Sequence, residues 1–105
     1  MVDNNTFGKY SEDKCLAHLM DEINKLDEHR QKRFCSWLDK NSKFIALANS
    51  EIKTKSLKNY VYSKLRADLI ITIRTKANIL NLEKDSKLPT LALNFLLTKI
   101  KINSK

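Results

Sequence analysis

Two cysteines and two histidines are the first candidates for chemistry in this sequence. Cys15 lies three residues before His18, and His29 lies six residues before Cys35. Four such ligands would suit Zn²⁺, but neither pair has the C-x-x-C or H-x-x-x-H spacing of common zinc sites. Cys15 with His18 is the only pair close enough to act as a nucleophile with its base. Because both cysteines fall within apolar stretches of helical period, we expect two buried thiols, two surface histidines and no metal ion.

The acidic residues offer no convincing acid–base pair. Asp21-Glu22 and Asp27-Glu28 are adjacent in sequence and lie on polar faces, where they are more simply explained as solubilising charge. Gly8 is the single glycine, so neither G-x-G-x-x-G nor a P-loop can be written for phosphate binding. The sequence therefore predicts a protein that is not an enzyme, with no catalytic residues, no cofactor and no small-molecule substrate.

Charge is distributed unevenly along the chain. The formal net charge is +8 and the pI is about 9.6. Residues 1–52 contain eight Lys/Arg and nine Asp/Glu, whereas residues 53–105 contain twelve and three. The positive charge belongs to the second half, which indicates an acidic partner such as nucleic acid. A basic face that is merely solvated is the alternative.

The elements that position these residues are mainly helical. With 105 residues, one glycine and one proline, the chain makes one small domain and is too poor in turn residues for a β-sandwich or barrel. Residues 1–10 have the composition of a flexible tail. Apolar residues at three- and four-residue steps predict a helical bundle over residues 11–66, with helices that begin at Ser11, at Asp27 and near Thr54. Asn41 and Ser42 are expected to interrupt the second of these, so that a separate helix follows with Phe44 to Ile52.

The segment from Leu69 to Thr75 is rich in β-branched residues, which favour a strand. One strand is not stable alone, so we expect it to pair with its own copy as a two-stranded ribbon across a dimer axis. Residues 67–105 would then form a dimerisation and DNA-binding module, whose last helix, over 91–102, is apolar on several sides and packs against another chain. The alternative is an all-α bundle with one long helix over about 55–84.

Strand, short helix, turn and apolar helix in this order resemble the ribbon-helix-helix family of DNA-binding dimers. The resemblance is carried by Ile70 to Arg74, by Ile79 and Leu82, and by Thr90 with Leu93 to Leu97. It implies that outward strand side chains read bases in the major groove and that the N-terminus of the last helix holds a phosphate. The turn Ser86-Lys87-Leu88-Pro89 departs from the family, which often has glycine there.

The upstream half is similar to the DNA-binding part of the MatP family, which organises the terminus macrodomain of bacterial chromosomes. The matching pieces are Trp37-Leu38-Asp39-Lys40 and Ile52-Lys53-Thr54-Lys55, with Lys58 and Tyr60. The resemblance covers roughly residues 12–102 and lacks the family's C-terminal coiled coil. It therefore implies DNA binding, but not the bridging of DNA that depends on that extension.

These observations and resemblances assign three sets of binding residues, in which Ile70 and Thr90 come from the resemblance. The expected base readers are Ile70, Thr72 and Arg74. The expected phosphate contacts are Lys53, Lys55, Lys58, Tyr62, Lys64, Arg66, Lys76 and Thr90. The expected dimer core is Leu69, Ile71, Ile73, Leu93, Phe95, Leu96, Leu97 and Ile100.

The leading prediction is a dimeric, sequence-specific protein for double-stranded DNA, which reads the major groove with a β-ribbon and the phosphates with a basic helix. Neither a signal peptide nor a membrane-spanning apolar run is visible in the sequence, so we expect a cytoplasmic protein without membrane contact, nucleoid-associated in a bacterial host. The alternative is a small all-helical interaction module, of the inhibitor or immunity type, that binds an acidic partner.

Overall fold

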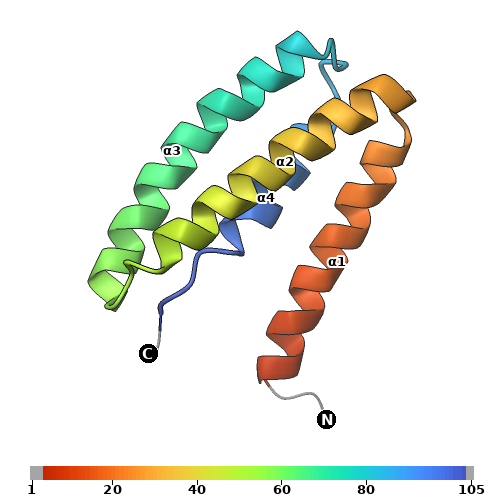
Figure 1. Ribbon diagram of the computed structural model, residues 1–105. Helices are drawn as coiled ribbons and strands as arrows, with labels where there is room; N and C mark the ends of the chain where they lie inside the picture. The colour runs from red at the N-terminus through yellow and green to blue at the C-terminus, as the bar shows by residue number, and fades with distance from the viewer. Residues whose placement is uncertain (1–3, 104–105) are drawn as a thin grey trace.

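The protein folds as three long α-helices around a short central one. The computed structural model describes residues 4–103, with side chains from Lys14 onward. The helices are α1 (Asn4–Asn24), α2 (Glu28–Asn49), α3 (Lys55–Ile79) and α4 (Leu88–Leu97). Figure 1 shows α2 between α3 and α1, with α4 behind it. Because α4 contacts all three longer helices, it forms the centre of the packing.

The segment expected to be a strand lies inside α3, which runs without a break from Lys55 to Ile79. Within residues 4–103 no strand occurs, so the predicted ribbon-helix-helix module is wrong and the all-α alternative describes the fold. The helix ends earlier than the expected position near residue 84. Helix α1 also begins upstream of Ser11, the expected N-cap, at Asn4, and residues 1–3 of the expected tail lie outside the described residues. The expected break at Asn41-Ser42 is absent, because α2 is continuous from Glu28 to Asn49, and the last helix spans Leu88–Leu97 instead of 91–102.

Burial explains why the β-branched segment is helical. Leu69 and Ile73 are four residues apart on one face of α3, and both are buried in the core. Each buried side chain contributes roughly 1.5–3 kcal/mol, whereas a β-branched residue in a helix costs less than about 0.7 kcal/mol relative to alanine. The hydroxyl groups of Thr72 and Thr75 donate to the carbonyls of Leu69 (3.2 Å) and Ile71 (3.0 Å), so both hydroxyls are satisfied within the helix.

The ends of α3 are encoded by local side chains and backbone geometry. Thr54 is the N-cap, and its hydroxyl accepts a hydrogen bond from the backbone N–H of Leu57 at 3.1 Å. At the other end Asn81 has a φ of 54°, a left-handed conformation that asparagine adopts more readily than most residues. The backbone N–H of Leu82 reaches back to the carbonyl of Ala77 at 3.0 Å, which closes the helix end.

The apolar faces of α4 are covered within the single chain. A core that includes Leu88, Ala92 and Leu96 on α4 is continuous with buried residues of α1, α2 and α3. The expectation that α4 needs another chain to cover it is therefore wrong. Of the expected dimer-core residues, those buried in this chain are Leu69, Ile73, Phe95, Leu96, Leu97 and Ile100. Leu93 is half-buried, and Ile71 is 65% exposed.

The segment after α4 is tied to the turn between α2 and α3. The side-chain amide of Asn49 donates to the carbonyl of Lys99 at 2.7 Å, and its oxygen accepts from the backbone N–H of Lys101 at 3.0 Å. The backbone N–H of Asn103 donates to the carbonyl of Ile52 at 2.7 Å. These hydrogen bonds fix the position of α4 relative to the start of α3. Among the described residues, no helix is both long and apolar enough to span a membrane.

Candidate binding surfaces on α2 and α3

Among the described side chains, the salt bridges lie in the first half of the chain. Among the residues whose side chains the structure describes, four salt bridges occur, and all of them join residues between Glu22 and Lys43 on or beside α1 and α2. From Lys53 to Lys101 the chain carries eleven Lys/Arg, and within that described stretch none makes a salt bridge. The positive charge of the second half is therefore not neutralised by local carboxylates, and it can interact with an anionic partner.

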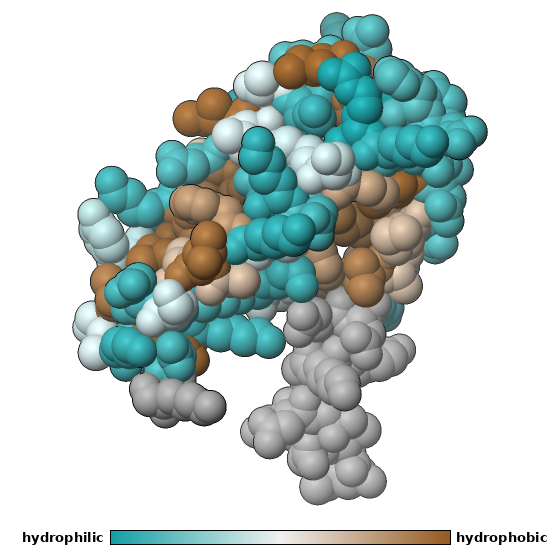
Figure 2. Space-filling view, viewed as in Figure 1, coloured by the Kyte–Doolittle hydropathy of each residue, from teal (hydrophilic) through white to brown (hydrophobic). Residues whose placement is uncertain are grey.

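One stripe of α3 combines these unpaired cations with large apolar side chains. We call it the outer stripe, and its members follow one another at four- and three-residue steps: Tyr60, Lys64, Ala67, Ile71, Arg74 and Asn78. All are exposed, and Tyr60 and Ile71 remain 61% and 65% exposed. The Lys64 ammonium nitrogen lies 5.7 Å from the centroid of the Tyr60 ring, a cation–π contact. Helix α3 forms one edge of the molecule (Figure 1), and Figure 2 shows isolated hydrophobic side chains among hydrophilic ones along that edge.

The structure brings together half of the expected phosphate contacts. Lys55, Lys58, Tyr62 and Arg66 step by three and four residues along α3 and share one side of it, distinct from the outer stripe. All but Lys58, which is half-buried, are exposed. The remaining expected residues are dispersed: Lys53 precedes the helix, Lys64 belongs to the outer stripe, Lys76 lines a groove against α2, and Thr90 is on α4.

The expected base readers do not share a face. In a helix, residues two apart differ by roughly 200° about the axis, so Thr72 points away from both Ile70 and Arg74. Ile70 is half-buried, and Arg74 lies on the outer stripe. The grouping of these three residues depended on strand geometry, so it does not apply to α3.

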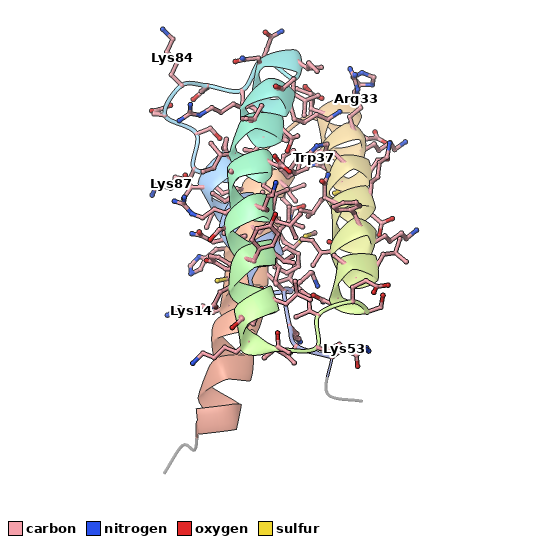
Figure 3. The ribbon with its side chains drawn as sticks, turned by 90° about the vertical axis from the view of Figure 1, so that its left-hand side faces the viewer. Lys14, Arg33, Trp37, Lys53, Lys84 and Lys87 are labelled. Atoms are coloured by element: carbon pink, nitrogen blue, oxygen red, sulfur yellow. The ribbon has the colours of Figure 1, made fainter. Side chains whose placement is uncertain are left out.

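A groove runs between α2 and the second half of α3. Its larger cavity, of about 830 Å³, lies at the end formed by the start of α2 and residues 79–81. A second cavity of about 370 Å³ lies further along, where Trp37 and Lys40 of α2 face Lys76 of α3. Lys32 and Arg33 line both cavities, so the two form one continuous groove, which we call the basic groove. In Figure 3 Trp37 lies between the two helices, below Arg33.

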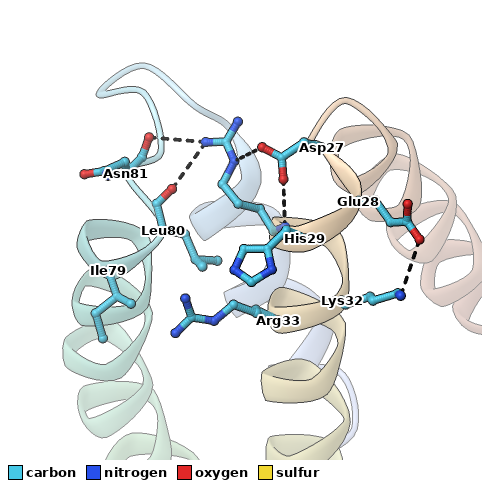
Figure 4. Close-up of a pocket in the computed structure, with 9 residues that line it drawn as sticks. Asp27, Glu28, His29, Lys32, Arg33, Ile79, Leu80 and Asn81 are labelled. Carbon is cyan, nitrogen blue, oxygen red and sulfur yellow. Dashed lines mark hydrogen bonds and ion pairs between the residues drawn. The ribbon is translucent and has the colours of Figure 1, made fainter.

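Arg30 and Lys32 are engaged in ion pairs at the wider end of the basic groove (Figure 4). Arg30 Nε lies 2.9 Å from Asp27 Oδ2, and Arg30 Nη1 donates to the carbonyls of Leu80 (3.2 Å) and Asn81 (3.4 Å). The hydrogen bond from the Arg30 backbone N–H lowers the pKa of the Asp27 carboxyl below its ordinary value of 3.8, and the guanidinium acts in the same direction. This end of the groove therefore links α2 to α3 structurally, whereas the cavity around Trp37 retains unpaired cations.

Sequence analysis missed the α2 side of the basic groove. It assigned the binding charge to residues 53–105, because the first half is nearly neutral overall. The available signal was the spacing of Arg33, Trp37 and Lys40, which places two cations and an aromatic ring on one side of a helix. The expectation of two buried thiols is also wrong, because Cys15 is half-buried and Cys35 is exposed.

Comparison with family models, curated proteins and solved structures finds no match to this chain. The resemblance to the MatP family therefore stays a prediction from sequence, now without the ribbon on which part of it rested.

Proposed function

We propose that this protein is a small helical interaction module that binds an acidic, amphipathic helix of a partner protein along the outer stripe of α3. The observation that carries the proposal is the alternation of exposed apolar and basic side chains on that stripe: Tyr60 and Ile71 with Lys64 and Arg74. Single exposed apolar residues are ordinary on protein surfaces. Their alignment with unpaired cations along one face is typical of a surface that recognises another helix.

The spacing of the stripe matches what helix-to-helix docking requires. Steps of four and three residues keep side chains on one seam of two packed helices. Tyrosine and arginine are also the residue types that most often act as energetic anchors in protein interfaces. A nucleic-acid surface, in contrast, needs cations and hydrogen-bond donors but gains little from exposed isoleucine.

Charge complementarity selects an acidic partner over a second copy of this chain. If two outer stripes packed in antiparallel register, Lys64 of each copy would face Arg74 of the other. In parallel register each cation would face its own counterpart. Like charges opposed across an interface are destabilising, whereas Asp or Glu at those positions would form ion pairs.

Selection of ligands from a random-peptide library tests the proposal. We expect enriched peptides to place Asp or Glu and large apolar residues at three- and four-residue spacing. The double variant Tyr60→Ser/Ile71→Ser should bind the enriched peptides at least about 10-fold more weakly, since each interface anchor is worth 1 kcal/mol or more. The control Ile102→Ser removes an exposed apolar side chain outside α3 and should leave binding unchanged.

A parallel selection from a random pool of double-stranded DNA tests the alternative, which is that the protein recognises DNA. A consensus DNA site together with no enriched peptide would overturn the proposal in favour of DNA recognition. Peptides that bind wild type and the double variant equally would place the binding surface away from the outer stripe and would also contradict it.

A further inference from the structure

The second cavity of the basic groove, around Trp37, is lined by residues that suit a bound anion. Its lining residues are Lys32, Arg33, Ser36, Trp37, Lys40 and Lys76. Four of these side chains carry a positive charge, and none of the lining residues is acidic. At about 370 Å³ the cavity is large enough for a small oxyanion with part of the group that bears it.

Three of the four cations are available to a ligand. Lys32 is paired with Glu28 at 3.3 Å. Within the described side chains Arg33, Lys40 and Lys76 have no salt bridge, and they line the same cavity from two helices. A bound anion would be attracted by all three positive charges.

We propose that this cavity is a binding site for a phosphate dianion, either inorganic phosphate or a phosphomonoester. A tetrahedral oxyanion with two negative charges offers acceptors to the Arg33 guanidinium and to both lysines at once. Ser36 and Trp37, whose side chains carry a hydroxyl and an indole N–H, also line the cavity and can supply further donors. A carboxylate, with one charge and two oxygens, would leave part of this donor set unused.

The cavity is open to solvent on one side. Of its lining residues Trp37 and Lys76 are half-buried, whereas Arg33 and Lys40 are exposed. Figure 3 shows Trp37 between α2 and α3. Partial removal from water strengthens the attraction between a cation and a bound anion. The indole ring also makes a tilted contact with the ring of Phe34, 5.5 Å between centroids, which anchors Trp37 to the core. The site is separate from the outer stripe of α3, so the two proposals can fail independently.

Trp37 provides a direct readout, because it is the single tryptophan of the chain. We would titrate the protein with sodium phosphate at constant ionic strength and follow both the tryptophan emission and the NMR shift of its indole N–H. A saturable change in either signal is expected. Acetate and dimethyl phosphate, which are monoanions, should bind at least about 10-fold more weakly, since each lost charge-assisted hydrogen bond costs that much.

Charge-matched variants locate the site. Lys76→Gln and Lys40→Gln should each weaken phosphate binding about 10-fold, by loss of one charge-assisted hydrogen bond. Lys53→Gln removes the same charge outside the cavity and should change the affinity by less than about 2-fold, because a distant exposed charge is screened. Circular dichroism of each variant checks that the helices are retained. Phosphate titrations that do not saturate, or Lys53→Gln acting as strongly as Lys76→Gln, would refute the site.

A further arm distinguishes the source of the phosphate group. Phosphoserine within a short peptide should bind more tightly than inorganic phosphate if the natural ligand is a phosphorylated protein. Equal affinity for the two would assign the site to free phosphate. Dimethyl phosphate binding as tightly as inorganic phosphate would contradict the dianion proposal and point to a nucleic-acid backbone.

Discussion

At the scale of single residues, Asp27 and Arg30 connect two distant parts of the chain. Asp27 caps the first turn of α2 by accepting from the backbone N–H of Arg30 at 2.9 Å. The guanidinium of Arg30 then holds two carbonyls just beyond α3, fifty residues away in sequence. One carboxylate thereby starts a helix and orients the side chain that fixes the end of another.

The lowered pKa of Asp27 predicts a pH-dependent contribution to stability. Because the folded-state pKa is depressed, the contribution is fully present above the unfolded pKa of about 3.9 and is lost as the pH falls through the folded value. Asp27→Asn keeps a good N-cap but removes the charge. Thermal unfolding should show a higher melting temperature for wild type at about pH 6, and the difference should shrink as the pH falls below about 3.9.

A constant difference between wild type and Asp27→Asn across this range would contradict the prediction. Glu28→Gln is the matched control, since Glu28 pairs with Lys32 at the surface through side chains that are 82% and 78% exposed. Exposed pairs of this kind contribute little to stability, so the control should show almost no effect at about pH 6.

At the scale of elements, the sequence predicted some helix boundaries and not others. Asp27 and Thr54, expected near helix starts, are N-caps, whereas Ser11 lies inside α1 and Asn41-Ser42 lies inside α2. The β-branched segment over 69–75 was assigned wrongly, because a short apolar run fits a strand and a helix alike. What decides between them is the burial of Leu69 and Ile73 in the core that includes α4, a tertiary contact that local sequence does not contain.

The Thr54 cap gives a prediction for α3. Thr54→Ala removes the side-chain acceptor for the backbone N–H of Leu57 and should cost about 1 kcal/mol of unfolding free energy, measured by urea denaturation. Thr75→Ala is the control on the same helix. Its hydroxyl only donates back to the Ile71 carbonyl, and alanine is the better helix former, so this change should be neutral or slightly stabilising. A loss from Thr54→Ala no larger than the effect of Thr75→Ala would contradict a stabilising cap at Thr54.

At the scale of the whole molecule, the question that sequence left open was how the apolar α4 is covered. A helix that is apolar on several sides is either covered within its own chain or shared with another, and its composition is the same in both cases. In the structure α4 packs against α1, α2 and α3, and within it only Thr90 and Asn94 are exposed. The basic groove was hidden for a related reason, since its two sides come from helices that only the fold brings together.

A single-chain core predicts how the protein unfolds. Leu96→Ala should cost about 2–5 kcal/mol, because Leu96 has no exposed surface, whereas Ile71→Ala should change stability by less than about 0.5 kcal/mol.

The melting temperature of wild type should also be independent of protein concentration, as measured by calorimetry over a dilution series. A midpoint that rises with concentration, or a large loss from Ile71→Ala, would indicate that a second chain completes the core.

The central position of α4 has a consequence for synthesis on the ribosome. Helices α1, α2 and α3 precede it in the chain, yet each of them contacts it, and the segment that follows it is bonded to Asn49 and Ile52. A nascent chain that ends before Leu88 therefore exposes the apolar faces of three helices with nothing between them. We therefore expect cooperative folding only after α4 has left the exit tunnel, and until then the three apolar faces stay exposed.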